Sequence, residues 1–351
     1  RDIQTRCRCS ILIALKRVAM HRVFPEIAET ARGATASSLY ELLLADEFFS
    51  EVHAYAPVYM PKDFPEIARR ATHVTFNSLA EYERHRRDLS GASPGLRINP
   101  EYSTVETDLY NPCIPGSRLG IQASDLPVLP EGIQGLHSHN LCESSAEDLS
   151  ATLDQIERLY AHLLDRISWI NLGGGHLVTS KGYDIPRLIS RISAFHTAHP
   201  HLDIILEPGA AFVWETGVLV AQVLDIVRSG GVSIAMVDTS FAAHMPDCLE
   251  MPYTPRIRGA SIADQTGAPQ GVRYRIGGAT CLAGDVVGDY WFPQELAVGD
   301  RIVFEDMMHY TMVKTNMFNG ISLPDIGIWR ESGGYELTAS FSYEDYRDRL
   351  S

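Results

Sequence analysis

The sequence contains a lysine placed where it could bond covalently to a carbonyl compound. Lys16 follows the apolar run Ile11–Leu15, which predicts a β-strand. A lysine amine at the end of a buried strand is partly desolvated, and desolvation lowers its pKa enough for Schiff-base formation. A lysine in this position is also commonly a solvated strand end, so Lys16 indicates a site only if other groups join it.

Two further groups follow apolar runs in the same way. Gly173-Gly174-Gly175 could let consecutive backbone N–H groups approach a phosphate, since no Cβ atom blocks them, although a turn without a ligand is equally compatible. Glu207-Pro208-Gly209 places a carboxylate that could keep a pyridine nitrogen protonated or could cap a helix. Neither group has the spacing of a Rossmann or Walker motif.

A pair of histidines offers a competing chemistry. His137-Ser138-His139 would point both imidazoles to one face of a strand, which suits zinc. The sequence shows no obvious third or fourth ligand, and a zinc site would leave Lys16 and the glycines unexplained. We therefore expect no metal.

Eight apolar runs separated by amphipathic segments must position these groups. Ala146–Leu164 and Ile185–His196 have helical periodicity. Alternating units of this kind predict an α/β fold, a closed (β/α)8 TIM-like barrel, whose strand ends would bring Lys16, the triglycine and Glu207 together. The predicted strands are Ile11–Leu15, Ala34–Ala36, Val52–Tyr55, Val74–Phe76, Leu96–Ile98, Ile133–Leu136, Ile170–Leu172 and Ile204–Leu206.

The pattern changes after Trp214. β-branched runs separated by Gly- and Pro-rich turns, among them Gly267-Ala268-Pro269, predict a C-terminal all-β domain. We expect the barrel domain to cover residues 1–217 and the β-domain 218–351. The predicted strands of the second domain include Val218–Val227, Ser233–Val237, Ile302–Phe304 and Tyr335–Thr338.

Composition excludes several classes of protein. The 351 residues carry a formal charge of −14, which argues against nucleic-acid binding and favours a cationic substrate or simply solubility. The longest apolar runs are too short to span a membrane. Six cysteines without a CxxC pair suggest reduced thiols. We expect a cytoplasmic enzyme.

Many strings along the chain resemble one family. They are similar to the fold-type III pyridoxal-5′-phosphate (PLP) decarboxylases, which act on diaminopimelate, ornithine and arginine, and in detail to the carboxynorspermidine/carboxyspermidine decarboxylase branch. The strings are Leu12–Lys16, Ala34–Glu41, Leu96–Tyr102, Gly135–Glu143, Asn171–His176, Glu207–Gly209, His244–Asp247, Leu249–Tyr253, Gly278–Asp285 and His309–Thr315.

The resemblance implies a role for each residue of a PLP site. Lys16 would hold the cofactor as a Schiff base, His139 would stack on its ring, and Glu207 would pair with the pyridine nitrogen. Loss of the substrate carboxylate would then feed electrons into the ring. The phosphate would be held by Gly174, Gly175, Gly209 and Tyr310.

The same resemblance implies that the active unit is a homodimer with shared sites. Cys281 would come from the partner subunit and protonate the substrate Cα, and Asp285 would bind a substrate amine. Asp247 and Glu250 suit a polyamine-like substrate, or else belong to a solvated loop. The expected product is norspermidine or spermidine, in polyamine biosynthesis.

Two alternatives remain open. A diaminopimelate or other basic amino acid decarboxylase would share the scaffold, although Ala210 stands where diaminopimelate decarboxylases carry an arginine. A non-catalytic PLP-binding relative would usually lack some of Lys16, Glu207, Cys281 and Asp285. The family also implies a strand and a helix before the lysine strand, where this sequence has only residues 1–10.

Overall fold

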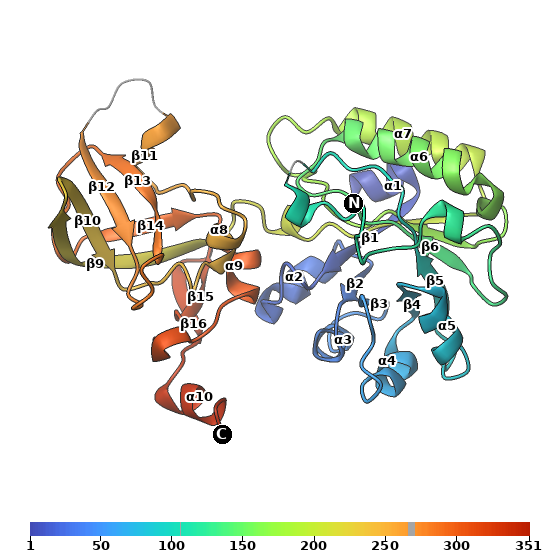
Figure 1. Ribbon diagram of the computed structural model, residues 1–351, viewed down its shortest axis with the longest axis horizontal. Helices are drawn as coiled ribbons and strands as arrows, with labels where there is room; N and C mark the ends of the chain where they lie inside the picture. The colour runs from blue at the N-terminus through green and yellow to red at the C-terminus, as the bar shows by residue number, and fades with distance from the viewer. Residues whose placement is uncertain (106, 266–270) are drawn as a thin grey trace. The chain divides into compact units, whose positions relative to one another are not determined.

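The computed structural model describes residues 1–105, 107–265 and 271–351. Within these residues the chain forms two compact units, Arg1–Phe212 and Val213–Ser351 (Figure 1). The turn predicted at Gly267-Ala268-Pro269 lies outside the described residues.

Unit 1 is a closed barrel of eight parallel strands in sequence order. Strand β8 pairs with β1 through the partners Cys9 and Ile204, which closes the barrel. The predicted (β/α)8 barrel followed by a β-domain is therefore confirmed. The strands are β1 (Cys9–Ala14), β2 (Gly33–Ala36), β3 (Val52–Tyr55), β4 (His73–Phe76), β5 (Ser93–Arg97), β6 (Gly135–His137), β7 (Trp169–Asn171) and β8 (Asp203–Leu206).

Most of the connections in unit 1 are helices that begin at a serine or aspartate cap. In α6, Ser145 accepts a hydrogen bond from the Asp148 backbone and the Asp148 side chain accepts one in return, a capping box that fixes the start of the helix. Helices α6 and α7 lie side by side (Figure 1). The helices are α1 (Asp2–Cys7), α2 (Phe24–Ala28), α3 (Leu39–Asp46), α4 (Phe64–Arg70), α5 (Leu79–His85), α6 (Ala146–Leu164) and α7 (Ile185–Ala198).

One connection departs from the alternation of strand and helix. Between β5 and β6, the described residues contain only the 3-10 turns Asp108–Tyr110 and Ala123–Asp125. Hydrogen bonds between side chains and the backbone stabilise turns in this long segment. For example, the carboxamide oxygen of Asn111 accepts a hydrogen bond from the Cys113 backbone N–H at 2.9 Å.

A tryptophan fills the barrel near the N-terminal ends of its strands. The Trp169 indole donates to Ser93 Oγ at 2.8 Å and packs with Leu12 and Ile205. It lies against Gly95 and Gly135, where an added Cβ would come within 2.3 and 2.0 Å of the ring. These two strand positions therefore have room only for glycine.

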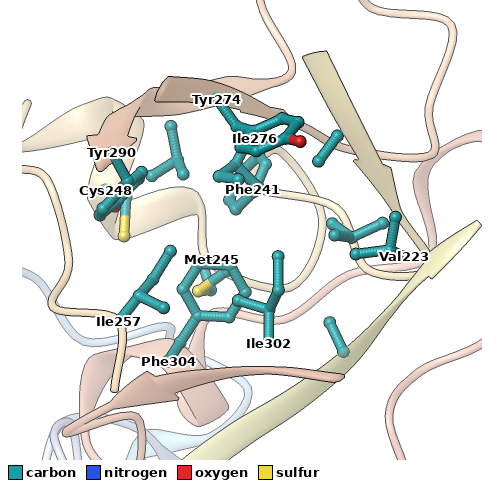
Figure 2. Close-up of a cluster of buried hydrophobic side chains, with 14 of the residues drawn as sticks. Val223, Phe241, Met245, Cys248, Ile257, Tyr274, Ile276, Tyr290, Ile302 and Phe304 are labelled. Carbon is teal, nitrogen blue, oxygen red and sulfur yellow. The ribbon is translucent and has the colours of Figure 1, made fainter. Parts of the chain in front are cut away.

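Unit 2 is built on a six-stranded sheet in the order β11-β13-β12-β10-β9-β14, with a separate two-stranded sheet of β15 and β16. A buried apolar cluster that includes Phe241, Tyr290 and Phe304 forms its core (Figure 2). The strands are β9 (Val218–Ser229), β10 (Val232–Val237), β11 (Ser261–Ile262), β12 (Val272–Gly277), β13 (Val286–Phe292), β14 (Arg301–Glu305), β15 (Ile326–Arg330) and β16 (Gly334–Ala339), and the helices are α8 (Pro246–Glu250), α9 (Tyr310–Val313) and α10 (Tyr343–Asp348).

No helix among the described residues is both long enough and apolar enough to cross a bilayer.

Candidate active site

The C-terminal ends of β1, β6, β7 and β8 bring the predicted groups of unit 1 together. Lys16 Nζ lies 3.1 Å from His139 Nε2. The other ring nitrogen, His139 Nδ1, accepts a hydrogen bond from the Gly174 backbone N–H at 2.9 Å. One imidazole thus connects the lysine to the glycine loop.

The glycine loop can exist only without side chains. Gly173 and Gly175 have φ values of 65° and 93°, in the left-handed region that glycine adopts without strain. A Cβ on Gly174 would come within 2.3 Å of the Glu207 carbonyl oxygen, and one on Gly175 within 2.3 Å of the Leu141 carbonyl oxygen. The loop therefore packs closely against the ends of β6 and β8.

Glu207 is buried and oriented by a neighbouring strand end. Its Oε1 accepts a hydrogen bond from Asn171 Nδ2 at 2.6 Å, and its Oε2 lies 3.7 Å from His137 Nε2. The other end of the Asn171 carboxamide accepts from the Gly173 backbone N–H at 2.8 Å. Asn171 therefore fixes both the carboxylate and the start of the glycine loop.

Two imidazoles in this site are kept neutral. Burial, reinforced by the charges of Lys16 and Arg97, holds the pKa of His139 well below its usual value. Burial and the Arg97 charge do the same to the pKa of His137. Arg97 is itself buried, donating to the His139 carbonyl oxygen at 2.7 Å and to the Tyr55 hydroxyl at 2.5 Å. A neutral ring is the form that can stack on an aromatic cofactor without carrying a buried charge.

This arrangement fits a pyridine ring that carries an aldehyde and a phosphate. It offers an amine, a neutral imidazole, a buried carboxylate and a loop whose close packing leaves no space for Cβ atoms. Gly209 continues the pattern, since a Cβ there would lie 2.7 Å from Arg17 Cβ. His137 and His139, the pair considered as an alternative zinc site, do not belong to a group of possible metal ligands among the residues that the structure describes. In that part of the chain, the group whose ligand atoms lie close enough together to hold one ion is Glu51, His53 and His73.

In unit 2, the predicted proton donor and its neighbour are placed very differently. Cys281 is exposed, and its backbone N–H donates to Asn319 Oδ1 at 2.8 Å. Asp285 is only 3% exposed. Its Oδ1 accepts from the backbone of Phe241 and Ala242, and its Oδ2 from both donors of Thr280. These bonds give Asp285 a structural task, shaping the loop that carries Cys281, and its contact with a substrate amine stays a prediction.

The other predicted residues of unit 2 lie on or beside α8 and α9. Asp247 is buried, and its Oδ2 accepts from the Tyr253 hydroxyl at 2.6 Å, while its Oδ1 has no hydrogen-bond partner among the residues that the structure describes. Glu250 forms an ion pair with Lys314, whose ammonium lies 5.8 Å from the centre of the Tyr310 ring. Asp247 Oδ1 is thus a buried acceptor whose hydrogen-bonding capacity the described residues leave unused.

Two residues of the site were not predicted from the sequence. Asn171 and Arg97 both interrupt apolar strand runs, and each is almost fully buried. A polar residue inside such a run is the one signal that could have identified them, because burial requires a partner.

Comparison with known proteins assigns the class. Residues 28–308 match the family described as pyridoxal-dependent decarboxylase, C-terminal sheet domain. The chain belongs to this family of PLP-dependent decarboxylases, and PLP is its cofactor. The predicted family and cofactor are therefore confirmed.

Individual relatives indicate which decarboxylases of this family the chain is similar to. The chain is 54% identical to carboxyaminopropylagmatine decarboxylase of Synechocystis sp., over 99% of this chain and 90% of the relative. It is 40% identical to carboxynorspermidine/carboxyspermidine decarboxylase of Campylobacter jejuni, over 96% of this chain and 90% of the relative. A crystal structure of carboxynorspermidine decarboxylase with norspermidine from Campylobacter jejuni matches with a TM-score of 0.90 and 37% identity, covering 99% of this chain and 94% of that chain.

Proposed function

We propose that this protein removes the Cα carboxylate of a carboxylated polyamine and that carboxyaminopropylagmatine is its preferred substrate. The contact of Lys16, His139 and the glycine loop at one end of the barrel carries the decarboxylase proposal. The 54% identity over nearly the whole chain to carboxyaminopropylagmatine decarboxylase supports the choice of substrate.

A second candidate is the reaction expected from the sequence, in which carboxynorspermidine or carboxyspermidine is the substrate. Relatives with this activity in their names are 36 and 40% identical to the chain. The two candidates differ at the end of the substrate, because agmatine carries a guanidinium group where spermidine carries an ammonium group.

Each residue of unit 1 has a proposed task. Lys16 holds the cofactor covalently, Gly174, Gly175 and Gly209 contact its phosphate, and His139 supports its ring. Glu207 holds a proton at the ring nitrogen, in an orientation set by Asn171. The bound cofactor supplies a ring that accepts the electron pair left when the Cα–carboxylate bond breaks.

The residues of unit 2 are proposed to handle the substrate and the proton. Cys281 delivers a proton to Cα from the partner subunit of a homodimer, and the loop shaped by Asp285 presents it. The free oxygen of Asp247 accepts from a cationic group of the substrate, and Glu250 and Asp285 add negative charge. Tyr310 completes the phosphate site. We also propose a cytoplasmic location, supported by six unpaired thiols.

Side-by-side kinetics test the choice of substrate. We expect kcat/KM to be highest for carboxyaminopropylagmatine, lower for carboxyspermidine and carboxynorspermidine, and lowest for diaminopimelate. Asp247→Asn should lower kcat/KM for the polyamine substrates by roughly 10- to 100-fold, because a charged hydrogen bond is lost. Asp225→Asn, an exposed position on β9, is the matched control. A kcat/KM that is higher for carboxyspermidine than for carboxyaminopropylagmatine would favour the second candidate. A kcat/KM that is highest for diaminopimelate would overturn both candidates.

A further inference from the structure

One carboxylate and two imidazoles meet at the N-terminal ends of β3 and β4, at the opposite mouth of the barrel from Lys16. Glu51 immediately precedes β3, His53 lies within it, and His73 is the first residue of β4. Residues i and i+2 of a strand point to the same face, and His53 and His73 are register partners across the strand pair. One possible ligand atom from each side chain lies within 4.8 Å of the other two.

One pair of atoms in this cluster is already spaced like two ligands of a single ion. Glu51 Oε1 lies 3.2 Å from His53 Nε2. Bonds of about 2.0–2.1 Å in a tetrahedral arrangement put neighbouring ligand atoms roughly 3.3 Å apart. The rings of His53 and His73 have centroids 3.9 Å apart, so a modest ring rotation brings both nitrogens toward a shared point.

The hydrogen bonds around His73 leave its Nε2 atom available to bind a metal ion. The hydroxyl of Thr72 donates its single proton to the Val52 carbonyl oxygen at 3.0 Å. Thr72 Oγ1 therefore acts as an acceptor for His73 Nδ1, 3.1 Å away, which places the ring proton on Nδ1. The lone pair of His73 is then on Nε2. Metal-bound histidines are commonly oriented by such a bond from the second nitrogen.

One oxygen of the carboxylate faces the imidazoles. Arg32 Nε pairs with Glu51 Oε2 at 2.6 Å, which leaves Oε1 facing His53 but keeps a competing positive charge beside the carboxylate. The His53 side chain is 5% exposed, whereas the Glu51 side chain is 19% exposed. The cluster is thus desolvated on one side and reachable from solvent on the other.

We propose that Glu51, His53 and His73 bind a divalent transition-metal ion, with zinc the best-suited cation. Two imidazoles and one carboxylate form a ligand set that zinc accepts, with water in the remaining position. The ion would tie β3 to β4 and stabilise the barrel. The site is independent of PLP and of the proposed substrate.

The test uses the holoenzyme, Zn²⁺ and Co²⁺. Equilibrium dialysis should show one zinc per chain in wild type, and His53→Gln and His73→Gln should each weaken binding by more than about tenfold, the lower bound for losing even an outer partner. His21→Gln, at an exposed position, should bind as wild type does. Co²⁺ should quench Trp169 fluorescence, since the indole lies 5.3 Å from the His73 ring and 6.3 Å from the His53 ring.

A variant that gains zinc affinity would distinguish a metal site from a network of ion pairs. Arg32→Gln removes the cation that competes for Glu51, so zinc should bind more tightly, while a network that only stabilises the fold would gain no zinc affinity. The proposal is overturned if wild type retains no zinc at micromolar concentrations, or if His53→Gln and His73→Gln bind it as wild type does. Because Arg32→Gln leaves both imidazoles in place, it decides the question even if a histidine variant folds poorly.

Discussion

At the scale of single residues, Asn171 holds two parts of the site in register. Its carboxamide bonds both to Glu207 and to the first glycine of the loop. We predict that Asn171→Ala lowers kcat/KM by roughly 10- to 100-fold, because a buried hydrogen bond to a charged group is lost. Steady-state decarboxylation measures this. Asn111→Ala, which removes a carboxamide from a loop cap, should stay near wild type, and equal effects in the two variants would exclude a specific role.

Buried histidines make stability depend on pH. Burial lowers the pKa of His176 to about 4, against roughly 6.5 in an unfolded chain. Between these values the unfolded state binds the proton and the folded state does not, so the free energy of unfolding falls as pH drops from about 6.5 to 4. Each such histidine contributes up to about 1.4 kcal/mol per pH unit.

The prediction for His176 is checked by urea unfolding across this range. His176→Asn cannot be protonated, so its stability should fall less steeply with decreasing pH than that of wild type. His137 and His139 act in the same direction and remain in both proteins. Identical slopes for the two proteins would show that His176 does not set this dependence.

The sequence predicted the residues that end strands but not those that support them. Lys16, Gly174 and Glu207 were recognised because each follows an apolar run, and the barrel brings such ends together. Asn171 and Arg97 lie inside the runs, where the sequence alone does not say which face a side chain occupies. The hydrogen bonds of Asp285 could not be foreseen either, since their donors come from segments some 40 residues apart along the chain.

At the scale of elements, the eight barrel strands were predicted to within a few residues. Val52–Tyr55 agrees with β3 at both ends, and the helix predicted at Ala146–Leu164 agrees with α6. The start of β5 was missed because Ser93-Pro94-Gly95 has turn-forming composition. In unit 2, β12 was missed although Val272–Ile276 alternates apolar and charged residues as a half-buried strand does, and β13 was missed because Gly288 and Asp289 interrupt its apolar run.

The contact of Gly135 with Trp169 predicts that a smaller side chain at position 169 relieves the destabilisation caused by Gly135→Ala. A Cβ on Gly135 would overlap the indole, while its backbone lies outside the left-handed region, so the cost of Gly135→Ala is steric. We expect it to destabilise the protein by about 1–3 kcal/mol. Trp169→Leu should cost less in the Gly135→Ala background than in wild type. Additive effects in chemical denaturation would show that the two positions do not interact.

At the scale of the whole molecule, the proposed roles are divided between two units. Lys16, His139 and Glu207, the residues proposed to hold the cofactor, belong to unit 1, whereas Cys281 and Asp247, proposed to act on the substrate, belong to unit 2. If unit 2 completes the site of a partner subunit, each site of a homodimer depends on both chains. This dependence can be tested without a structure of the dimer.

Mixing inactive variants reveals a shared site. Lys16→Ala and Cys281→Ala homodimers should each be nearly inactive, and random exchange of their subunits should restore up to about a quarter of wild-type activity, since half of the dimers then have one intact site. Mixing Lys16→Ala with Glu207→Ala is the control and should restore none, because both changes lie in unit 1. If the first mixture also stays inactive after subunit exchange, the site is not shared in this way.

The most direct test of the proposed function is CO₂ release from carboxyaminopropylagmatine at saturating PLP, by wild type, Lys16→Ala and Lys181→Ala. Lys181 is an exposed lysine and serves as the matched control. We predict sustained release by wild type and Lys181→Ala, and none above background by Lys16→Ala. Release by Lys16→Ala at the wild-type rate, or no release by wild type from this substrate or from carboxyspermidine and carboxynorspermidine, would contradict the proposed function.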